Sequence, residues 1–256
     1  MKKSISAQFL LLTGAIAFVS WGACVAFNLS GFSLNQDYWM YLPYMAGVWS
    51  PTIASYFVLK SNNQISGFKE WLKNVFDGKR PIWMYLFVIL LASSYFIPQI
   101  LIFGITEMKP AYMLIILVPL MLFCGGLEEA GWRYILQPEL DTKVGYILSS
   151  IIVSAIWAVW HLPLFFIAGS SQSEMNFGVF AIGIVGLTFV LGALRKVTKS
   201  VFLCVLLHCL VNVGKGVFIF EDTLWGSVVE TALLIIISVC VVAFYERKEQ
   251  AKPHLT

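Results

Sequence analysis

The sequence predicts an all-α protein that crosses the membrane several times, and three observations support this fold class. Hydrophobic residues make up 59% of the 256 residues, and the mean hydropathy is +0.81. Charged residues make up only 12%, whereas soluble domains are about one-quarter charged. Several apolar runs approach or exceed the roughly 20 residues that a helix needs to cross a bilayer. We therefore expect residues 1–256 to form a single integral membrane domain.

Apolar segments separated by turn residues and charges are the candidate transmembrane helices, and we predict about eight of them. They are residues 7–27, 41–59, 82–103, 112–137, 144–167, 177–194, 201–218 and 228–245. The first begins with basic residues like a signal peptide but lacks a small-residue cleavage motif, so we expect it to be retained. Residues 66–80 are too charged to span, and their apolar residues recur at helical spacing. We expect this segment to lie on the membrane surface.

The distribution of basic residues predicts the orientation. Eight crossings place both termini on one side, and of the 17 lysines and arginines only Lys109 and Lys215 fall on the other side. Basic residues accumulate in cytoplasmic loops. We therefore expect cytoplasmic N- and C-termini in a bacterial plasma membrane, with the lipid bilayer and no nucleic acid as a partner. The five cysteines lie in apolar segments without C-x-x-C spacing, which predicts neither a disulfide framework nor a zinc knuckle.

Three ionisable residues lie close together in the stretch "CGGLEEAGWRYIL", which follows an apolar run. Such side chains are costly in a bilayer unless they face the protein interior, so each is a candidate for function. Glu129 and Arg133 are four residues apart, in the order that favours an ion pair on one helix face. Glu128 has Trp132 as its neighbour on the next turn, an apolar wall that would desolvate the carboxylate and suit it to acid–base work. The alternative is a helix end with both carboxylates in solvent.

Two histidines lie deep in apolar segments, whereas His254 lies in the charged tail. Trp157 and His161 are four residues apart in "AIWAVWHLPLFF", and His208 and Asn212 have the same spacing in "VFLCVLLHCLVNVGKG". Each pair therefore shares a helix face. An imidazole and a carboxamide can both donate hydrogen bonds to a developing negative oxygen. The alternative is that they pack and hydrogen-bond between helices. We expect all three clusters to face one interior site.

These clusters resemble the motifs of a membrane-protease family. "EEAGWR" fits E-E-x-x-x-R, the first motif of the CAAX prenyl protease type II and bacteriocin-processing family (CPBP, also called Abi). "WAVWH" resembles the second motif, usually F-x-x-x-H, and "HCLVN" resembles the third, H-x-x-x-N. The resemblance covers residues 112–217, which correspond to the catalytic core of that family. Trp157 replaces the phenylalanine of the second motif, a change that we expect to affect packing rather than chemistry.

The resemblance implies an eight-helix intramembrane endopeptidase with a catalytic cavity among its helices and no cofactor. In such an enzyme the first glutamate activates water, the first histidine helps to hold the water, and the last two residues stabilise the oxyanion. The implied catalytic residues are Glu128, His161, His208 and Asn212, and the supporting residues are Glu129, Arg133, Trp132 and Trp157. The substrate would be a peptide or protein that enters from the membrane or the cytoplasmic side, such as a CAAX-type tail, a leader or a membrane peptide.

Two other functions stay open at this point. A zinc-dependent intramembrane metalloprotease could use Glu128, His161 and His208 as metal ligands, although no H-E-x-x-H helix is present to place two of them together. A non-enzymatic immunity or scaffold protein, or a small transporter, could also carry intramembrane glutamates and histidines. A proton relay has no need of a histidine–asparagine pair beside a base, so the sequence favours hydrolysis.

Overall fold

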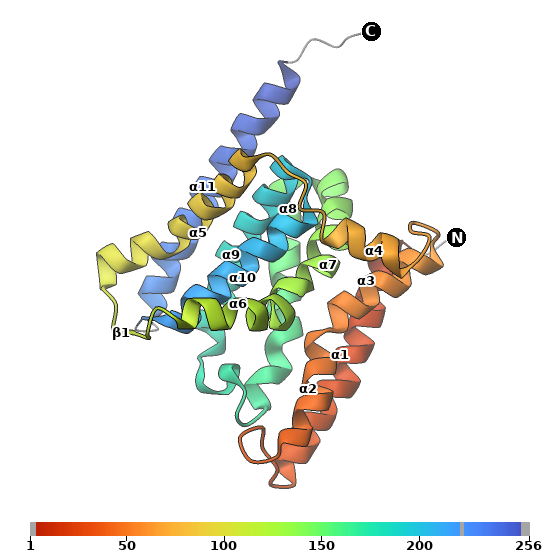
Figure 1. Cartoon of the computed structure of the whole chain (residues 1–256), viewed down its shortest axis with the longest axis vertical. Coiled ribbons are helices and arrows are strands. Elements are labelled where there is room, and N and C mark those ends of the chain that lie inside the picture. Colours follow the sequence, from red (N-terminus) through yellow and green to blue (C-terminus); the bar gives the residue numbers. More distant parts are fainter. Residues whose placement is uncertain (1–3, 221–222, 252–256) are drawn as a thin grey trace.

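The computed structural model describes residues 4–220 and 223–251, and it is built almost entirely of α-helices (Figure 1). The predicted all-α class is therefore confirmed. Each of the eight predicted segments is helical, and five of them correspond to one continuous helix each. These helices are α1 (Ile5–Leu29), α5 (Ile82–Phe103), α9 (Phe177–Thr198), α10 (Val201–Val217) and α11 (Leu224–Gln250).

The second predicted segment is not one helix but two. α2 (Tyr41–Val48) ends at Trp49, and α3 (Ser50–Ser61) begins directly after it. The break has a local cause, because Pro51 has no N–H to donate to the preceding turn. α2 stays close to α1 through Gly47, where a Cβ would lie 2.3 Å from the Trp21 side chain.

The fourth and fifth predicted segments are also interrupted, and the interruptions lie around the motif glutamates. α6 (Met113–Cys124) ends before Gly125, and a short 3₁₀ turn at Gly126–Glu128 leads into α7 (Glu129–Gly131) and a π-helical turn at Trp132–Leu136. α8 (Gln137–His161) follows, with a kink at Gly145, whose φ of 76° is in the left-handed region open to glycine. A 3₁₀ turn at Leu162–Phe166 ends this part of the chain.

Five stretches within the described residues are long and apolar enough to cross a membrane. They are Ile5–Leu29, Ile82–Phe103, Met113–Phe166, Phe177–Thr198 and Leu224–Gln250, and α10 is a shorter apolar helix. The stretch Met113–Phe166 has 54 residues and includes both the fourth and the fifth predicted segments. The chain is thus an integral membrane protein by length and composition of its helices, while the number of eight crossings stays a prediction.

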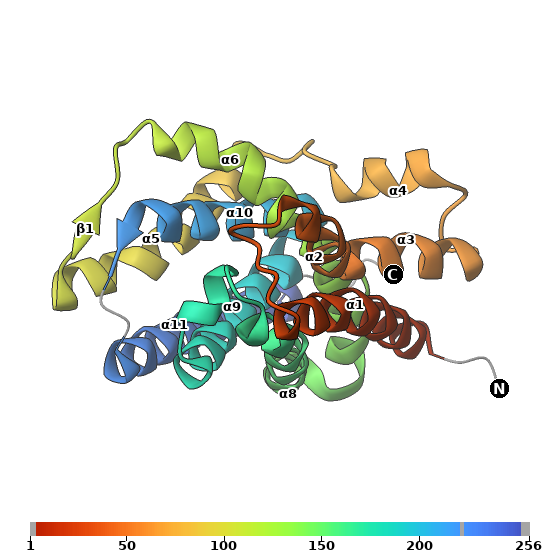
Figure 2. The ribbon, with the colours of Figure 1, turned by 90° about the horizontal axis from the view of Figure 1, so that it is seen from below.

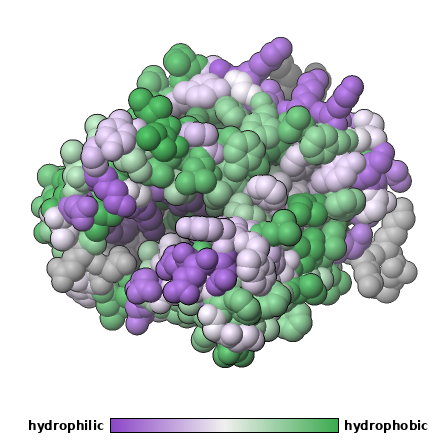
Figure 3. Space-filling view, turned by 60° about the horizontal axis from the view of Figure 1, so that its bottom comes forward, coloured by the Kyte–Doolittle hydropathy of each residue, from purple (hydrophilic) through white to green (hydrophobic). Residues whose placement is uncertain are grey.

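The outer surface of the molecule agrees with a lipid environment. Figure 3 shows hydrophobic residues spread over much of one face, with hydrophilic residues gathered in smaller groups. Large apolar side chains such as Phe18, Leu42, Leu101 and Ile115 are each more than three-quarters exposed. Contiguous apolar surface on this scale is rare in soluble monomers and marks contact with a partner or a membrane.

The predicted surface segment forms α4 (Phe68–Val75), a short helix whose apolar side chains are partly buried and partly exposed. Trp71 and Val75 are buried, and the Trp71 indole donates a hydrogen bond to Ser55 of α3. Phe68 and Leu72 are exposed. The helix is therefore fixed to the bundle, and its location at a membrane surface stays a prediction.

The helices pack so that α8 and α11 flank α9, while α10 contacts α5, α6 and α9. Figures 1 and 2 show α6 running across α10, in a direction unlike that of α8. Two short strands close this side of the fold, because β1 (Glu107–Met108) pairs antiparallel with β2 (Phe218–Ile219). This pairing, which the sequence did not predict, joins the loop after α5 to the end of α10.

The helices that carry the motifs meet α1 and α3 at a glycine. A Cβ on Gly131 would lie 2.6 Å from the Phe9 ring and 2.8 Å from the Pro51 carbonyl oxygen, so only glycine permits this approach. Trp132 then packs edge-on against Phe9 at 5.3 Å and against Trp160 at 5.7 Å between ring centroids. Aromatic contacts of this kind fix the angle at which α7 enters the core.

Candidate active site

Glu128 lies inside the protein and not at a solvated helix end. Its side chain belongs to the 3₁₀ turn that follows Gly125, and the residue is only 6% exposed. The Glu128 Oε2 atom accepts a hydrogen bond of 2.9 Å from the indole Nε1 of Trp157 on α8. The break after α6 redirects the chain, so the carboxylate faces α8 and α10 instead of lipid.

Gly125 and Gly126 allow this turn to press against α10. A Cβ on Gly125 would lie 2.3 Å from Asn212 Nδ2 and 3.6 Å from His208 Nε2. A Cβ on Gly126 would lie 2.8 Å from the carbonyl oxygen of Val205. The glycine pair is thus the point where the first and third motifs come together, and both side chains of the third motif border the Gly125 backbone.

Glu129 is the centre of a fully buried ionic group. Its Oε2 atom lies 3.0 Å from Arg133 Nη1, with both side chains completely inaccessible, so the ion pair expected from the spacing is present. Its Oε1 atom lies 2.8 Å from Nδ1 of His208, a contact that the sequence did not predict. Because a carboxylate only accepts hydrogen bonds, Nδ1 of His208 carries a proton and the Nε2 atom is turned towards Gly125.

Trp157 contacts residues of all three motifs, and one of these contacts is a side-chain hydrogen bond. Besides its hydrogen bond to Glu128, its backbone carbonyl lies 2.8 Å from His161 Nδ1. Its ring lies edge-on to the His208 ring at 5.3 Å, and the Arg133 guanidinium lies 4.8 Å from the ring centroid. Tryptophan in place of phenylalanine thus adds a contact besides packing, because phenylalanine has no N–H to donate to Glu128, and whether this contact affects the chemistry stays a question for experiment.

His161 is buried at the end of α8, with its ring enclosed by aromatic side chains. Ring centroids lie 4.6 Å from Trp160 and 5.0 Å from Phe180. A backbone carbonyl only accepts, so the His161 Nδ1 atom bonded to it carries the proton. In a neutral imidazole the Nε2 atom then has a free lone pair, which suits it to accept a hydrogen bond from water.

The structure therefore brings the predicted residues of all three motifs into one region, in which Asn212 is half-buried and the other motif residues are buried. Trp132 belongs to its outer wall, where it packs against Phe9 and Trp160. The contact between Glu129 and His208 and the N–H donated by Trp157 were not found from the sequence. Helical spacing shows which residues of one helix share a face, but it does not show which faces of two helices meet.

The three residues that would bind zinc in the metal-dependent alternative do not form a metal site. No group of three or more His, Cys, Asp or Glu side chains able to hold a metal ion exists within residues 4–220 and 223–251. Glu128, His161 and His208 thus do not fit a zinc ion in this conformation. Glu128 and His208 each have a hydrogen-bond partner from the protein instead.

Comparison with known proteins agrees with the motifs. Residues 110–214 match the family described as type II CAAX prenyl endopeptidase Rce1-like. The CAAX prenyl protease 2 of Methanococcus maripaludis is 28% identical over 141 residues, which cover 50% of this chain and 49% of that protein. The chain thus matches about half the length of this curated relative. The predicted resemblance to the CPBP family is confirmed, and the matched segment contains all three motifs.

Proposed function

Because residues 110–214 match the Rce1-like type II CAAX prenyl endopeptidase family, we propose that this chain is an intramembrane endopeptidase that uses glutamate-activated water. One observation carries the proposal. The Glu128 carboxylate is buried beside Trp157 on α8, within the same group of side chains as His161 and His208. A base in a region closed to bulk water can act on a bound water molecule and on a peptide bond brought next to it.

In the first step a water molecule lies between Glu128 and His161. One hydrogen of the water points to the carboxylate and the other to the Nε2 lone pair of the imidazole. The water oxygen attacks the peptide carbonyl carbon while Glu128 takes the proton, so a carbon–oxygen bond forms and the carbonyl π bond becomes an oxyanion. Trp157 keeps the carboxylate in place through its Nε1 hydrogen bond.

His208 and Asn212 stabilise the oxyanion. The amide Nδ2 of Asn212 is a donor as it stands. The Nε2 atom of His208 donates only when the ring carries a second proton, because Nδ1 already donates to Glu129. Glu129 accepts from Nδ1 and so holds the His208 ring with Nε2 towards Gly125, which makes Glu129 a support for this donor as well as the partner of Arg133. Each such donor lowers the barrier by about 3–4 kcal/mol in a dry site.

In the second step the tetrahedral intermediate collapses. The carbon–nitrogen bond breaks, and Glu128 returns its proton to the leaving nitrogen, which becomes an amine. The carbonyl π bond forms again in the new carboxyl group, and the histidine and asparagine donors are free for another cycle. No cofactor takes part in the proposed reaction.

The substrate is a peptide or protein that reaches the site from the membrane or from the cytoplasmic side. The name of the curated relative favours a CAAX-type prenylated tail over a leader or a membrane peptide. We place both termini in the cytoplasm, as the distribution of the basic residues predicts, and we propose a bacterial plasma membrane as the location.

The test uses purified protein in detergent micelles and quenched-fluorescence peptides that include a farnesylated CAAX sequence, a leader sequence and an apolar membrane segment. Glu128→Gln should reduce the cleavage rate by about 10²–10⁴-fold, the range for loss of a general base. The control is Glu107→Gln, at an exposed residue of β1. It should cleave like the wild type.

Two further results would contradict the proposal. If prolonged treatment with 1,10-phenanthroline abolished cleavage and added Zn²⁺ restored it, the reaction would depend on metal. If the Glu128→Gln variant restored the phenotype of cells that lack the gene as well as the wild type does, the chain would act as a scaffold, an immunity protein or a transporter.

A further inference from the structure

The first turn of α3 contacts the chain that leads into Glu128, although α3 carries none of the three motifs. The indole Nε1 of Trp49, the residue before α3, donates a hydrogen bond of 2.8 Å to the carbonyl oxygen of Phe123. The hydroxyl of Thr52 donates a hydrogen bond of 2.9 Å to the carbonyl oxygen of Leu127. Two side chains thus bind both ends of the segment 123–127, and the second bond is made to the peptide group that joins Leu127 to Glu128.

These bonds support a turn that lacks the regular hydrogen bonds of a helix. In an α-helix each carbonyl accepts from the N–H four residues further on, and the last four carbonyls have no such partner. Phe123 lies in the last turn of α6, and the Glu128 N–H donates to the Gly125 carbonyl only three residues back. Gly125 and Gly126 have no side chain that could fix the turn. The position of the turn therefore depends in part on the donors from α3.

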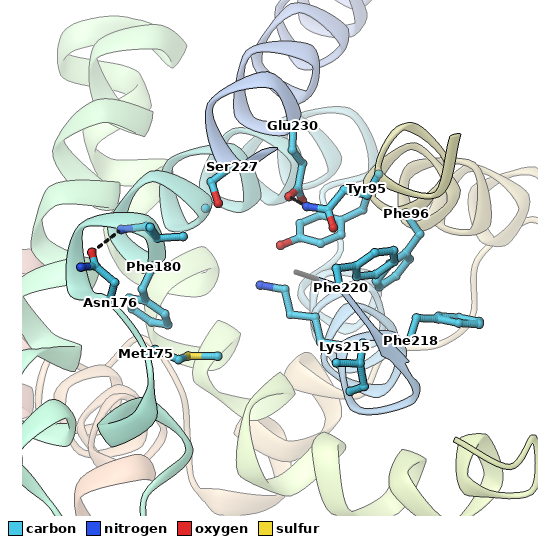
Figure 4. Close-up of a pocket in the computed structure, with 14 residues that line it drawn as sticks. Tyr95, Phe96, Met175, Asn176, Phe180, Lys215, Phe218, Phe220, Ser227 and Glu230 are labelled. Carbon is cyan, nitrogen blue, oxygen red and sulfur yellow. Dashed lines mark hydrogen bonds between the residues drawn. The ribbon is translucent and has the colours of Figure 1, made fainter. Parts of the chain in front are cut away.

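The same turn of α3 also contacts the helix with the second motif. The Ser50 hydroxyl accepts a hydrogen bond of 3.1 Å from the indole of Trp160 on α8, and the Trp160 ring packs against His161 at 4.6 Å between centroids. Figure 4 shows Phe180 of α9, which lines the pocket between α5, α9, α10 and α11 and packs against His161 at 5.0 Å from another helix. One turn of α3 is thus bonded to the Glu128 turn and to the neighbour of His161.

Thr52 is well fixed within α3. Its backbone carbonyl accepts a hydrogen bond of 2.7 Å from the hydroxyl of Ser55, and that hydroxyl accepts one of 3.0 Å from the indole of Trp71 on α4. A β-branched side chain such as threonine also has few rotamers in a helix. The hydroxyl that binds Leu127 therefore has little freedom to move.

We propose that Thr52, together with Trp49, is a positioning residue of the peptidase. Its hydroxyl holds the Leu127–Glu128 peptide group so that the carboxylate stays directed at the water between Glu128 and His161. The inference rests on the proposed peptidase function and adds residues outside the motifs. Catalytic groups must be held within about 0.5 Å of the productive geometry. Because Thr52 acts through the backbone of Glu128 and not on the substrate, its loss should lower kcat and leave KM nearly unchanged.

The test variant is Thr52→Val, which removes the hydroxyl and keeps the branched shape. The matched control is Thr231→Val on α11, a helix that carries none of the motifs. The Thr231 hydroxyl also donates at 2.9 Å to a backbone carbonyl of another helix, that of Ile182 on α9. The two variants therefore lose the same kind of bond, and only one of these bonds is made to the Glu128 turn.

Steady-state cleavage is measured with a peptide that the wild type hydrolyses. Thr52→Val should lower kcat about tenfold or more, since a misplacement of about 1 Å can cost about a hundredfold in rate. Thr231→Val should keep kcat within about twofold of the wild type, and both variants should keep KM within about twofold. Thr52→Ser retains the hydroxyl and should recover most of kcat.

A second measurement does not depend on cleavage. Hydrogen–deuterium exchange of backbone amides in detergent reports local opening of the chain. In Thr52→Val the amides of residues 123–131 should exchange about two- to tenfold faster than in the wild type, the factor expected from one neutral hydrogen bond. Trp49→Phe should accelerate exchange in the same segment, and Thr231→Val should leave it unchanged.

The outcomes separate this inference from the proposed function. Equal kcat in Thr52→Val and Thr231→Val, or a loss in Thr52→Val that Thr52→Ser does not recover, would overturn the inference even if peptides are cleaved. Unchanged exchange of residues 123–131 in Thr52→Val would also overturn it. Faster exchange in this segment, in a protein that cleaves none of the test peptides, would keep the contact from α3 to the Glu128 turn and overturn the peptidase proposal.

Discussion

Replacement of Trp157 by phenylalanine tests the most specific feature of the site. The variant retains an aromatic ring between Glu128 and the histidines but lacks the Nε1–H that donates to Glu128 at 2.9 Å. A hydrogen bond to a charged group contributes about 1.5–3 kcal/mol. If the bond positions the carboxylate in the transition state, its loss should lower kcat by about 10- to 150-fold, at 1.4 kcal/mol per factor of ten. KM should change little, because the substrate does not contact this bond.

The matched control is Trp160→Phe. Trp160 is also buried, packs on the same His161 ring, and donates its Nε1–H at 3.1 Å to the neutral hydroxyl of Ser50. Both variants lose the same atoms from the core, so both should lower the midpoint of thermal unfolding to a similar extent. Only Trp157→Phe should lose kcat by tenfold or more.

The assay is steady-state cleavage of a peptide that the wild type hydrolyses, with thermal unfolding measured on the same samples. Full activity in a folded Trp157→Phe protein, or equal loss of kcat in both variants, would refute a positioning role for the indole N–H.

Two further predictions concern the buried ion pair and the glycine turn. Arg133→Met leaves a buried carboxylate without its cation and should reduce the free energy of unfolding by about 3–5 kcal/mol. Lys143→Met breaks an ion pair that is more than half exposed at the lysine and should cost less than about 1 kcal/mol in the same denaturation experiment. Gly125→Ala places a Cβ 2.3 Å from Asn212 Nδ2, so cleavage should fall at least about tenfold, the cost expected when an oxyanion donor is displaced. Gly14→Ala, where a Cβ meets nothing within 4 Å, should leave cleavage unchanged, and equal rates in the two alanine variants would contradict the close approach at the turn.

The helices could be predicted from the sequence because each apolar run is long and its ends are marked by turn residues or charges. α5 begins and ends at the predicted residues, after Pro81 and before Gly104. The second segment differs because hydropathy does not register that Pro51 removes a backbone donor in the middle of an apolar run. The interruptions in the fourth and fifth segments depend on glycine conformation and on packing against α10, neither of which has a hydropathy signal.

The candidate site was predictable within each helix and less so between helices. The ion pair of Glu129 and Arg133 follows from spacing alone, since helical neighbours four residues apart share a face. The bond from Glu129 to His208 joins residues 79 positions apart and depends on how α7 meets α10. The hydrogen bond from Trp157 to Glu128 was not predicted for the same reason, because it depends on how the turn after α6 meets α8.

The ionic group around Glu129 also has a consequence for biosynthesis. The chain emerges from the ribosome in order, so the segment with Glu129 enters the membrane long before His208 has been made. During that interval only Arg133, one turn further on, can compensate the acid. Since the pair forms within a single helical turn, the charge of Glu129 is already compensated while the nascent segment is inserted, and the later arrival of α10 adds His208 as a second partner of the acid.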